Sequence, residues 1–208
     1  CRHLTLNGFV GEPLMHPDFV RVLDYIERRW PQVAAMLATN ATPLKGARME
    51  AILASRILRE LRISVNAVRE DTYNAIMVRA RWDRTMANIR EFMRQRRERG
   101  VASRLAAVFS FVAMRQNIDE LPEFVAWAAD LGADQVLVWD TMLSQDQNAD
   151  LAVVNDGNDR GRTDAAYEAA RRTAEQAGIA ITLPTPYVCE DAAGAPVSDV
   201  VTFRCNLP

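Results

Sequence analysis

The sequence predicts an α/β fold, a partial (βα)6-type TIM barrel. Short apolar runs alternate with longer segments of helical periodicity along the 208 residues, which is typical of repeated strand–helix units around a parallel sheet. Polar side chains follow several of the apolar runs, as expected where parallel strands end at a binding edge. A complete eight-unit barrel takes about 250 residues, so six units favour a partial or open barrel.

Six segments are predicted as strands because they are short and apolar and are separated by roughly one strand–helix unit. They are residues 3–7, 34–39, 61–65, 105–114, 135–139 and 179–183.

The segments between these strands are predicted to be helical. Residues 17–30 begin with Pro17, which suits the first turn of a helix, and residues 119–131 end before Gly132, which suits a helix C-terminus. Three more helices are predicted from their periodicity and flanking residues, with a short helical turn after Glu70: residues 47–54, 82–99 and 164–177.

Two segments do not fit the strand–helix pattern. Residues 145–162 are rich in Asp, Asn and Gly, and we expect a loop that could cover a site. Residues 184–208 contain Pro184, Pro186 and Pro196 and are predicted to be a linker. The sequence therefore predicts a barrel domain over residues 1–183 and a separate segment over residues 184–208.

Composition excludes several classes of partner. The chain has 25 Lys and Arg against 27 Asp and Glu, so no strong field attracts nucleic acid or an anionic membrane. No apolar stretch approaches the roughly 20 residues that span a bilayer, and no signal peptide pattern opens the chain. The three cysteines are far apart, without a C-x-x-C pair, which favours a reducing cytoplasm over a disulfide framework.

The candidate site lies where the first three strands end. Gly11, Glu12 and Pro13 follow the first strand; Gly permits close approach to the backbone, and Pro fixes the exit toward a helix. If the strands are neighbours in chain order, this turn shares one opening with the polar residues that end the next two strands: Thr39, Asn40, Ser64 and Asn66. Glu12 is the only charged member of this set. The set therefore suits a polar, zwitterionic small molecule better than a phosphate.

Structural roles are the alternatives for these residues. Glu12 could be a solvated carboxylate near the start of the following helix, and Ser64 and Asn66 could be ordinary turn formers. His3 and His16 have no second ligand at metal-binding spacing, so we assign neither to a metal site. The Arg-rich segment of residues 79–99 is interpreted as a solvated helix face.

At these positions the sequence resembles the radical S-adenosylmethionine (SAM) superfamily. The segment from Gly11-Glu12-Pro13-Leu14 to Phe19 resembles the region of that family's Gly-Gly-Glu-Pro motif on its second strand. Further similar segments follow in the family's order: Thr39-Asn40-Ala41-Thr42, Ile63-Ser64-Val65-Asn66, Arg115-Gln116-Asn117, Glu120-Leu121-Pro122-Glu123-Phe124 and Leu131-Gly132-Ala133-Asp134.

The resemblance implies an enzyme that binds SAM beside a four-iron, four-sulfur (4Fe-4S) cluster. Such enzymes generate a 5′-deoxyadenosyl radical that abstracts hydrogen from a peptide or small-molecule substrate, with an electron donor such as a flavodoxin or ferredoxin. By the same resemblance, Gly11 and Glu12 receive the amino group of SAM and Pro13 shapes their turn. The other implied SAM contacts are Thr39 and Asn40 along the same face, Ser64 and Asn66 at the carboxylate or ribose, and Val138 and Trp139 near the adenine. No catalytic residue is assigned.

The sequence departs from the family pattern in two ways. Val10 occupies the position of the family's first glycine, and the C-x-x-x-C-x-x-C loop that ligates the cluster is absent from these 208 residues. The resemblance therefore implies that the first strand and the cluster loop precede residue 1, and that this chain alone does not cleave SAM. A cluster-free barrel that binds a ligand or a partner is the alternative.

The last residues carry a further resemblance. The segment Phe203-Arg204-Cys205-Asn206-Leu207-Pro208 is similar to the opening of a SPASM extension, an auxiliary cluster domain. This implies Cys205 as a candidate ligand of an auxiliary cluster. A cysteine packed in a linker is the alternative.

Overall fold

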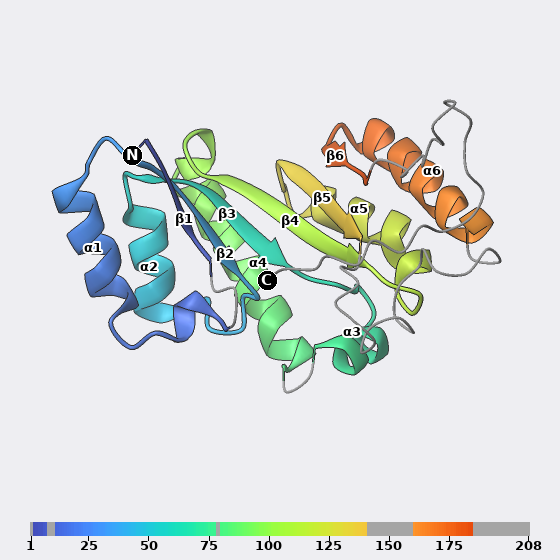
Figure 1. The fold of residues 1–208 in the computed structure, drawn as a ribbon, viewed down its shortest axis with the longest axis horizontal. Coiled ribbons are helices and arrows are strands. Elements are labelled where there is room, and N and C mark those ends of the chain that lie inside the picture. Colours follow the sequence, from blue (N-terminus) through green and yellow to red (C-terminus); the bar gives the residue numbers. More distant parts are fainter. Residues whose placement is uncertain (1, 8–10, 78–79, 141–159, 185–208) are drawn as a thin grey trace, which may run out of the picture.

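The protein has a six-stranded, all-parallel sheet with helices between successive strands (Figure 1). The computed structural model describes residues 2–7, 11–77, 80–140 and 160–184. The strands follow chain order across the sheet: β1 (His3–Leu6), β2 (Ala34–Thr39), β3 (Leu58–Ser64), β4 (Ala106–Ala113), β5 (Gln135–Asp140) and β6 (Ala180–Thr182). The predicted α/β class and partial barrel are therefore confirmed.

The helices also match the predicted alternation. Their bounds are α1 (Phe19–Arg29), α2 (Gly46–Ala54), α3 (Glu70–Ile76), α4 (Trp82–Glu98), α5 (Leu121–Asp130) and α6 (Arg160–Ala177). Three short 3-10 helices join them: η1 (Pro13–Met15), η2 (Val101–Ser103) and η3 (Ile118–Glu120). Because α6 starts at Arg160, the last residues of the predicted 145–162 loop are helical, and its first residues lie outside the described part. None of the described helices has the length and apolar character needed to cross a membrane.

The two faces of the sheet differ in residue type. Parallel strands in chain order, joined by right-handed crossovers, place their helices on one face. Along β2 to β5, the side chains that point toward the helices are large, apolar and buried, for example Leu37, Ile63, Phe109 and Phe111. The alternate positions point to the opposite face, which we call the inner face. The helix side therefore holds the main hydrophobic core.

The carboxyl ends of the strands lie along one edge of the sheet. The register pairs Thr39 with Ile63, Ser64 with Ser110, and Val112 with Trp139. In Figure 1, α1 and α2 lie at the β1 end of the sheet, and α6 lies at the β6 end. The polar residues that end β2, β3 and β5 are thus brought to the same edge.

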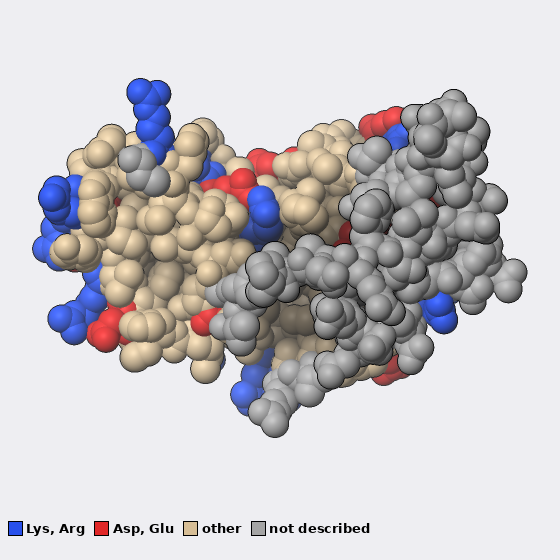
Figure 2. Space-filling view, in the orientation of Figure 1, with Lys and Arg blue, Asp and Glu red and all other residues tan. Residues whose placement is uncertain are grey.

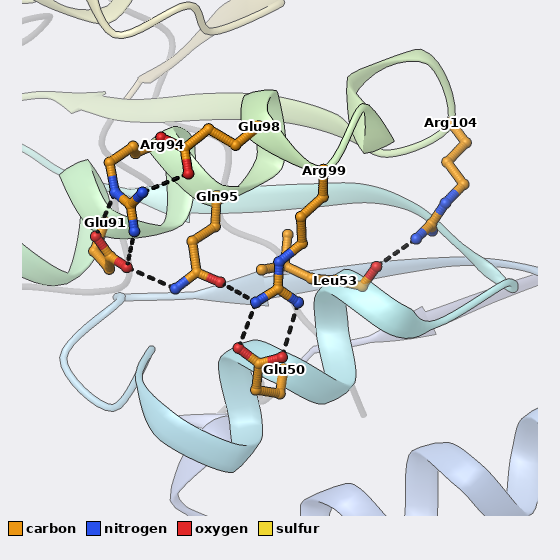
Figure 3. A network of polar contacts seen from close by, with 8 residues as sticks. All are labelled: Glu50, Leu53, Glu91, Arg94, Gln95, Glu98, Arg99 and Arg104. Atoms are coloured by element: carbon orange, nitrogen blue, oxygen red, sulfur yellow. Dashed lines mark hydrogen bonds and ion pairs between the residues drawn. The ribbon is translucent and has the colours of Figure 1, made fainter.

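Ion pairs connect the helices that cover the sheet. Arg99, which ends α4, donates two hydrogen bonds to Glu50 of α2, at 2.8 and 2.7 Å (Figure 3). Figure 3 also shows Arg94 between Glu91 and Glu98 on the exposed side of α4. These exposed pairs agree with the predicted solvated helix face. Arg96 of the same segment departs from the prediction, because it is buried and donates to the carbonyls of Leu105 and Gly132.

Candidate functional site

Glu12 connects the turn after β1 to the end of β2. Gly11 has a φ of +115°, a backbone conformation that residues with a Cβ atom rarely adopt. Glu12 is the N-cap residue of the short helix η1. The Leu14 N–H donates to Glu12 Oε1 at 3.1 Å, and the Thr39 hydroxyl donates to the same oxygen at 2.7 Å. The Asn40 N–H donates to Oε2 at 2.6 Å. The predicted convergence of Glu12, Thr39 and Asn40 is therefore present in the structure.

The Glu12 carboxylate keeps one acceptor position. A carboxylate has about four lone-pair sites, and the three hydrogen bonds occupy two on Oε1 and one on Oε2. The remaining site on Oε2 can receive a donor from a ligand, and a cationic donor would be preferred. Glu12 thus combines a structural role with a binding capacity.

The loop after β2 is held in a strained conformation. Ala41 has φ of +60°, which costs a residue with a side chain roughly 1–2 kcal/mol. The Thr39 hydroxyl accepts from the Ala41 N–H at 3.0 Å, and the Asn40 side-chain oxygen accepts from the Thr42 N–H at 3.0 Å. Asn88 of α4 donates to the carbonyls of Ala41 and Thr42 at 3.2 and 2.9 Å. These bonds fix Asn40 beside Glu12.

A cavity of about 290 Å³ lies against this pair. Its lining combines Glu12, Asn40 and Thr42 with apolar side chains from η1, the β2 loop and the α3 end: Met15, Pro43, Ile76, Met77 and Ala80. Its volume is at the lower end of the range of roughly 300–1,000 Å³ for small-molecule pockets. The cavity therefore suits an amino-acid-sized group with a cationic end near Glu12 and an apolar chain.

Ser64 and Asn66 lie further along the strand-end edge. The Ser64 hydroxyl is 3.1 Å from the Ser110 hydroxyl. Asn66 Oδ1 accepts from the Val112 N–H at 3.0 Å, while Asn66 Nδ2 lies 3.8 Å from the Met77 sulfur, a weak contact with a residue that lines the cavity. Both side chains therefore make contacts within the protein, and neither lines the cavity.

Val138 and Trp139 point to opposite faces of β5. The Val138 side chain is 2 % exposed in the helix-side core, so a ligand could meet only its backbone. Trp139 is 47 % exposed on the inner face. Of the two residues predicted near an adenine, Trp139 alone presents a ring to a ligand.

Asp140 at the end of β5 is a further titratable group near this edge. The Tyr167 hydroxyl donates to Asp140 Oδ1 at 2.9 Å. Burial raises the pKa of Asp140 above its usual value, and the hydrogen bond from Tyr167 opposes that rise. Burial and the adjacent Asp140 carboxylate raise the pKa of Tyr167 as well. No local sequence pattern signals this pair, because Tyr167 is 27 residues away in α6.

Comparison with known proteins identifies the fold. No protein-family model matches the sequence, and no curated protein sequence matches it. Among solved structures, Streptococcus suis SuiB superposes with a TM-score of 0.62 and 16 % identity over 89 % of this chain and 40 % of SuiB. A domain of pyruvate-formate lyase-activating enzyme from Bacteroides vulgatus gives a TM-score of 0.54 and 12 % identity over 87 % of this chain and 98 % of that domain. Both are radical SAM enzymes. The chain has the radical SAM fold.

Two further SuiB structures carry ligands. SuiB bound to S-adenosylmethionine matches with a TM-score of 0.60 and 15 % identity over 89 % of this chain and 40 % of that one. SuiB bound to the precursor peptide SuiA matches with a TM-score of 0.61 and 16 % identity over 86 % of this chain and 37 % of that one. The chain spans about 40 % of the SuiB length, and at these identities the similarity establishes the radical SAM fold alone.

The described part of the radical SAM fold contains no ligand set for a cluster. Within residues 2–7, 11–77, 80–140 and 160–184, no group of three His, Cys, Asp or Glu side chains could hold a metal ion. Cys1, Cys189 and Cys205 lie outside the described residues, as do Val10 and the segment that resembles a SPASM extension. The described residues therefore do not fit an iron–sulfur cluster, whereas those around Glu12 fit an amino-acid-like ligand.

Sequence reasoning missed the apolar wall of the cavity. Met15, Ile76 and Met77 have the spacing of ordinary packing residues, and nothing local distinguishes them from core positions. The short helical turn expected after Glu70 was the one signal for Ile76 and Met77. A helical turn directly after a strand lies over the strand-end edge, where its side chains can line a site.

Proposed function

We propose that the protein is a radical SAM enzyme that binds SAM in the cavity beside Glu12. In this proposal a 4Fe-4S cluster would supply the electron for SAM cleavage, and the 5′-deoxyadenosyl radical would abstract hydrogen from a peptide or small-molecule substrate. The observation that carries the proposal is the Glu12 carboxylate, which is held by Thr39 and Asn40 and keeps one acceptor site at the cavity. The shared fold with SuiB, which has been crystallised with SAM, supports it.

The described residues would divide the work of holding SAM. Glu12 Oε2 would accept from the ammonium group, and Met15, Ile76 and Met77 would contact the apolar part of the methionine moiety. The hydroxyl of Ser64 and the amide of Asn66 would hydrogen-bond the carboxylate or ribose. Trp139 would stack on the adenine, since its ring is exposed. The protein thereby orients the cofactor and excludes water from it.

The iron–sulfur cluster would supply the electron that cleaves SAM. Since the described residues do not fit it, its ligands are assigned to none of them. Cys205 as an auxiliary ligand in a SPASM-type extension, a flavodoxin or ferredoxin as electron donor and a cytoplasmic location stay predictions from the resemblance. The SuiB complex with the precursor peptide SuiA favours a peptide among the two substrate classes.

SAM binding by Glu12 variants tests the proposal. Glu12→Gln keeps the size of the side chain and removes its charge, and a charged hydrogen bond is worth about 1.5–3 kcal/mol, so SAM affinity should fall by roughly 10- to 100-fold. Isothermal titration calorimetry with SAM measures this change. Glu123→Gln on α5 is the matched control, because Glu123 is exposed and is not part of the cavity lining. Equal SAM affinity of Glu12→Gln and the unsubstituted protein would contradict the proposed site.

Reconstitution separates an enzyme from a cluster-free binding protein. The complete protein that carries this sequence would be supplied anaerobically with iron and sulfide, reduced, and given SAM. We expect visible charge-transfer absorbance and release of 5′-deoxyadenosine. A colourless protein that still binds SAM through Glu12 would instead indicate a binding module.

A further inference from the structure

We propose that the inner face of the sheet binds an acidic side chain of a peptide substrate, and that Arg62 of β3 is the residue that recognises it. That the bound peptide is the substrate rests on the proposed function; the carboxylate site itself rests on the geometry below. Arg62 is not among the site residues predicted from the sequence.

The inner face carries an ion pair in the middle of β3. Arg62 Nε and Nη2 donate to Glu60 Oε1 at 3.1 and 2.7 Å. Both side chains are half-buried, 25 % exposed for Arg62 and 30 % for Glu60. Among the described residues, Arg62 Nη1 and Glu60 Oε2 have no hydrogen-bond partner. The pair therefore retains one donor group and one acceptor oxygen for a ligand.

Each residue of this ion pair has one alanine neighbour in the sheet. The sheet register places Arg62 between Ala38 of β2 and Val108 of β4, and it places Glu60 between Met36 of β2 and Ala106 of β4. One layer nearer the strand ends, Ser64 lies beside Ser110. Barrel interiors are usually filled by bulky branched residues. Here the alanine on one side of each charged residue, and the two serines above, leave space for a polar group.

Stability does not account for the ion pair. A partly exposed ion pair contributes little, and moving two charges out of water carries a desolvation cost. On the opposite face of β3, Leu61 and Ile63 supply the buried apolar contacts that hold the strand. An Arg and a Glu on the inner face are better explained by a ligand that uses them.

The chemistry of Arg62 selects a carboxylate. A guanidinium is a planar fork of donors that matches a carboxylate with two parallel hydrogen bonds. Glu60 Oε2 would accept from a nearby N–H of the same ligand, and peptides carry such donors beside acidic side chains.

The position of Arg62 also suits a substrate. Arg62 lies two residues before Ser64, which is about 6.6 Å along the strand from the strand-end edge. A peptide side chain that reaches Arg62 therefore lies below the strand-end edge. Figure 2 shows acidic and basic atoms beside each other near the middle of this view. Substrate and SAM would occupy neighbouring levels of the same opening.

A pair of isosteric peptides tests the inference. The probes are N-acetyl-Gly-Glu-Gly-amide and N-acetyl-Gly-Gln-Gly-amide, each titrated into the ¹⁵N-labelled full chain without SAM or cluster. The Glu peptide should shift the amide signals of residues 60–64 and 106–110, with an affinity at least about tenfold above that of the Gln peptide. Equal shifts from both peptides, or none in these segments, would overturn the inference.

Three variants separate recognition from a structural role. Arg62→Gln should abolish the preference for the Glu peptide, whereas Glu60→Gln should strengthen binding of the Glu peptide, because it removes the internal competitor for Arg62. A purely structural ion pair would give two variants with the same loss of stability and no change in preference. Arg94→Gln on α4, an exposed arginine paired with Glu91 and Glu98, is the control and should change nothing. Retention of the preference by Arg62→Gln would refute the assignment.

The two proposals fail independently. If the unsubstituted protein does not bind SAM but still prefers the Glu peptide, the enzyme proposal is wrong and the carboxylate site remains supported. If the protein binds SAM through Glu12 but does not prefer the Glu peptide over the Gln peptide, the carboxylate site is wrong and the SAM site remains supported.

Discussion

A buried asparagine organises the strand-end edge at the level of single residues. Asn117 is 1 % exposed and follows β4. Its side-chain oxygen accepts from the Met114 N–H at 2.7 Å, and its amide donates to the carbonyls of Asn66 and Val112 at 2.8 and 2.9 Å. Asn66 in turn accepts from the Val112 N–H. Asn117 thus fixes the position of a predicted SAM contact that it does not itself make.

Replacing Asn117 should therefore be costly. Asn117→Ala leaves one buried N–H and two carbonyls without this partner, so the free energy of unfolding should fall by about 2–4 kcal/mol. Urea unfolding followed by circular dichroism measures the change. Asn74→Ala, at an exposed position of α3, should stay within about 0.5 kcal/mol of the unsubstituted protein. A similar small change for Asn117→Ala would show that the edge does not depend on this network.

Sequence reasoning at this scale identified polar residues better than apolar ones. Glu12, Thr39 and Asn40 were predicted to converge because each ends a strand, and parallel strands end at one edge. Met15 and Met77 were not predicted, since an apolar residue that lines a cavity has the same local pattern as one in the core. Arg62 was missed because its neighbours on the inner face come from other strands.

At the level of elements, α6 is joined to β5 by a pair of titratable side chains. Tyr167 donates to Asp140, and both are half-buried. Burial raises the pKa of Asp140, so the folded state holds its proton more firmly than the unfolded state does. The stability that this provides is complete below the unfolded pKa of about 3.9 and is lost as the pH rises through the higher folded pKa.

Asp140→Asn should therefore stabilise the protein at neutral pH. The amide remains uncharged and its oxygen can still accept from Tyr167, so the melting temperature should exceed that of the unsubstituted protein above the folded pKa of Asp140. The difference should vanish in acid. Thermal melts over a pH series measure it.

Asp83 gives a control of opposite sign. A hydrogen bond from Arg81 lowers the pKa of Asp83, so its contribution to stability is present above the unfolded pKa and is lost as the pH falls through the folded pKa. Asp83→Asn should therefore melt lower than the unsubstituted protein at neutral pH. The same sign of change for both variants would contradict the assigned role of burial at Asp140.

The bounds of the strands and helices could mostly be predicted from the periodicity of apolar residues in the sequence. All six predicted strands and all five predicted helices are present, with ends displaced by a few residues. The start of β3 at Leu58 was missed because Arg59, Glu60 and Arg62 interrupt the apolar pattern, and only pairing with β2 and β4 reveals the longer strand. The start of α6 was displaced because its first residues, Arg160 and Gly161, continue the polar composition of the preceding segment.

At the level of the whole molecule, the described sheet is open at β1. Among the described strands, β1 pairs only with β2, and none of them pairs with its other edge. Helix α1 and its flanks lie at this end and carry most of the exposed large apolar side chains of the described chain: Met15, Val20, Val22, Tyr25 and Trp30. Tyr25 is 59 % exposed and packs edge-on against Trp30 at 6.1 Å. An exposed strand edge beside apolar side chains favours association between copies of the chain.

Charges on α1 should therefore reduce self-association of the isolated chain. In the double variant Val22→Glu/Tyr25→Glu, both carboxylates point to solvent, and the one at position 25 lies four residues before Arg29, a favourable helical spacing. The weight-average mass from sedimentation velocity should fall toward the monomer, with an almost unchanged melting temperature. The double variant Asn74→Glu/Gln176→Glu adds the same charge at exposed positions elsewhere. An equal fall in both variants would assign the effect to net charge, and no fall in either would exclude α1 as the associating surface.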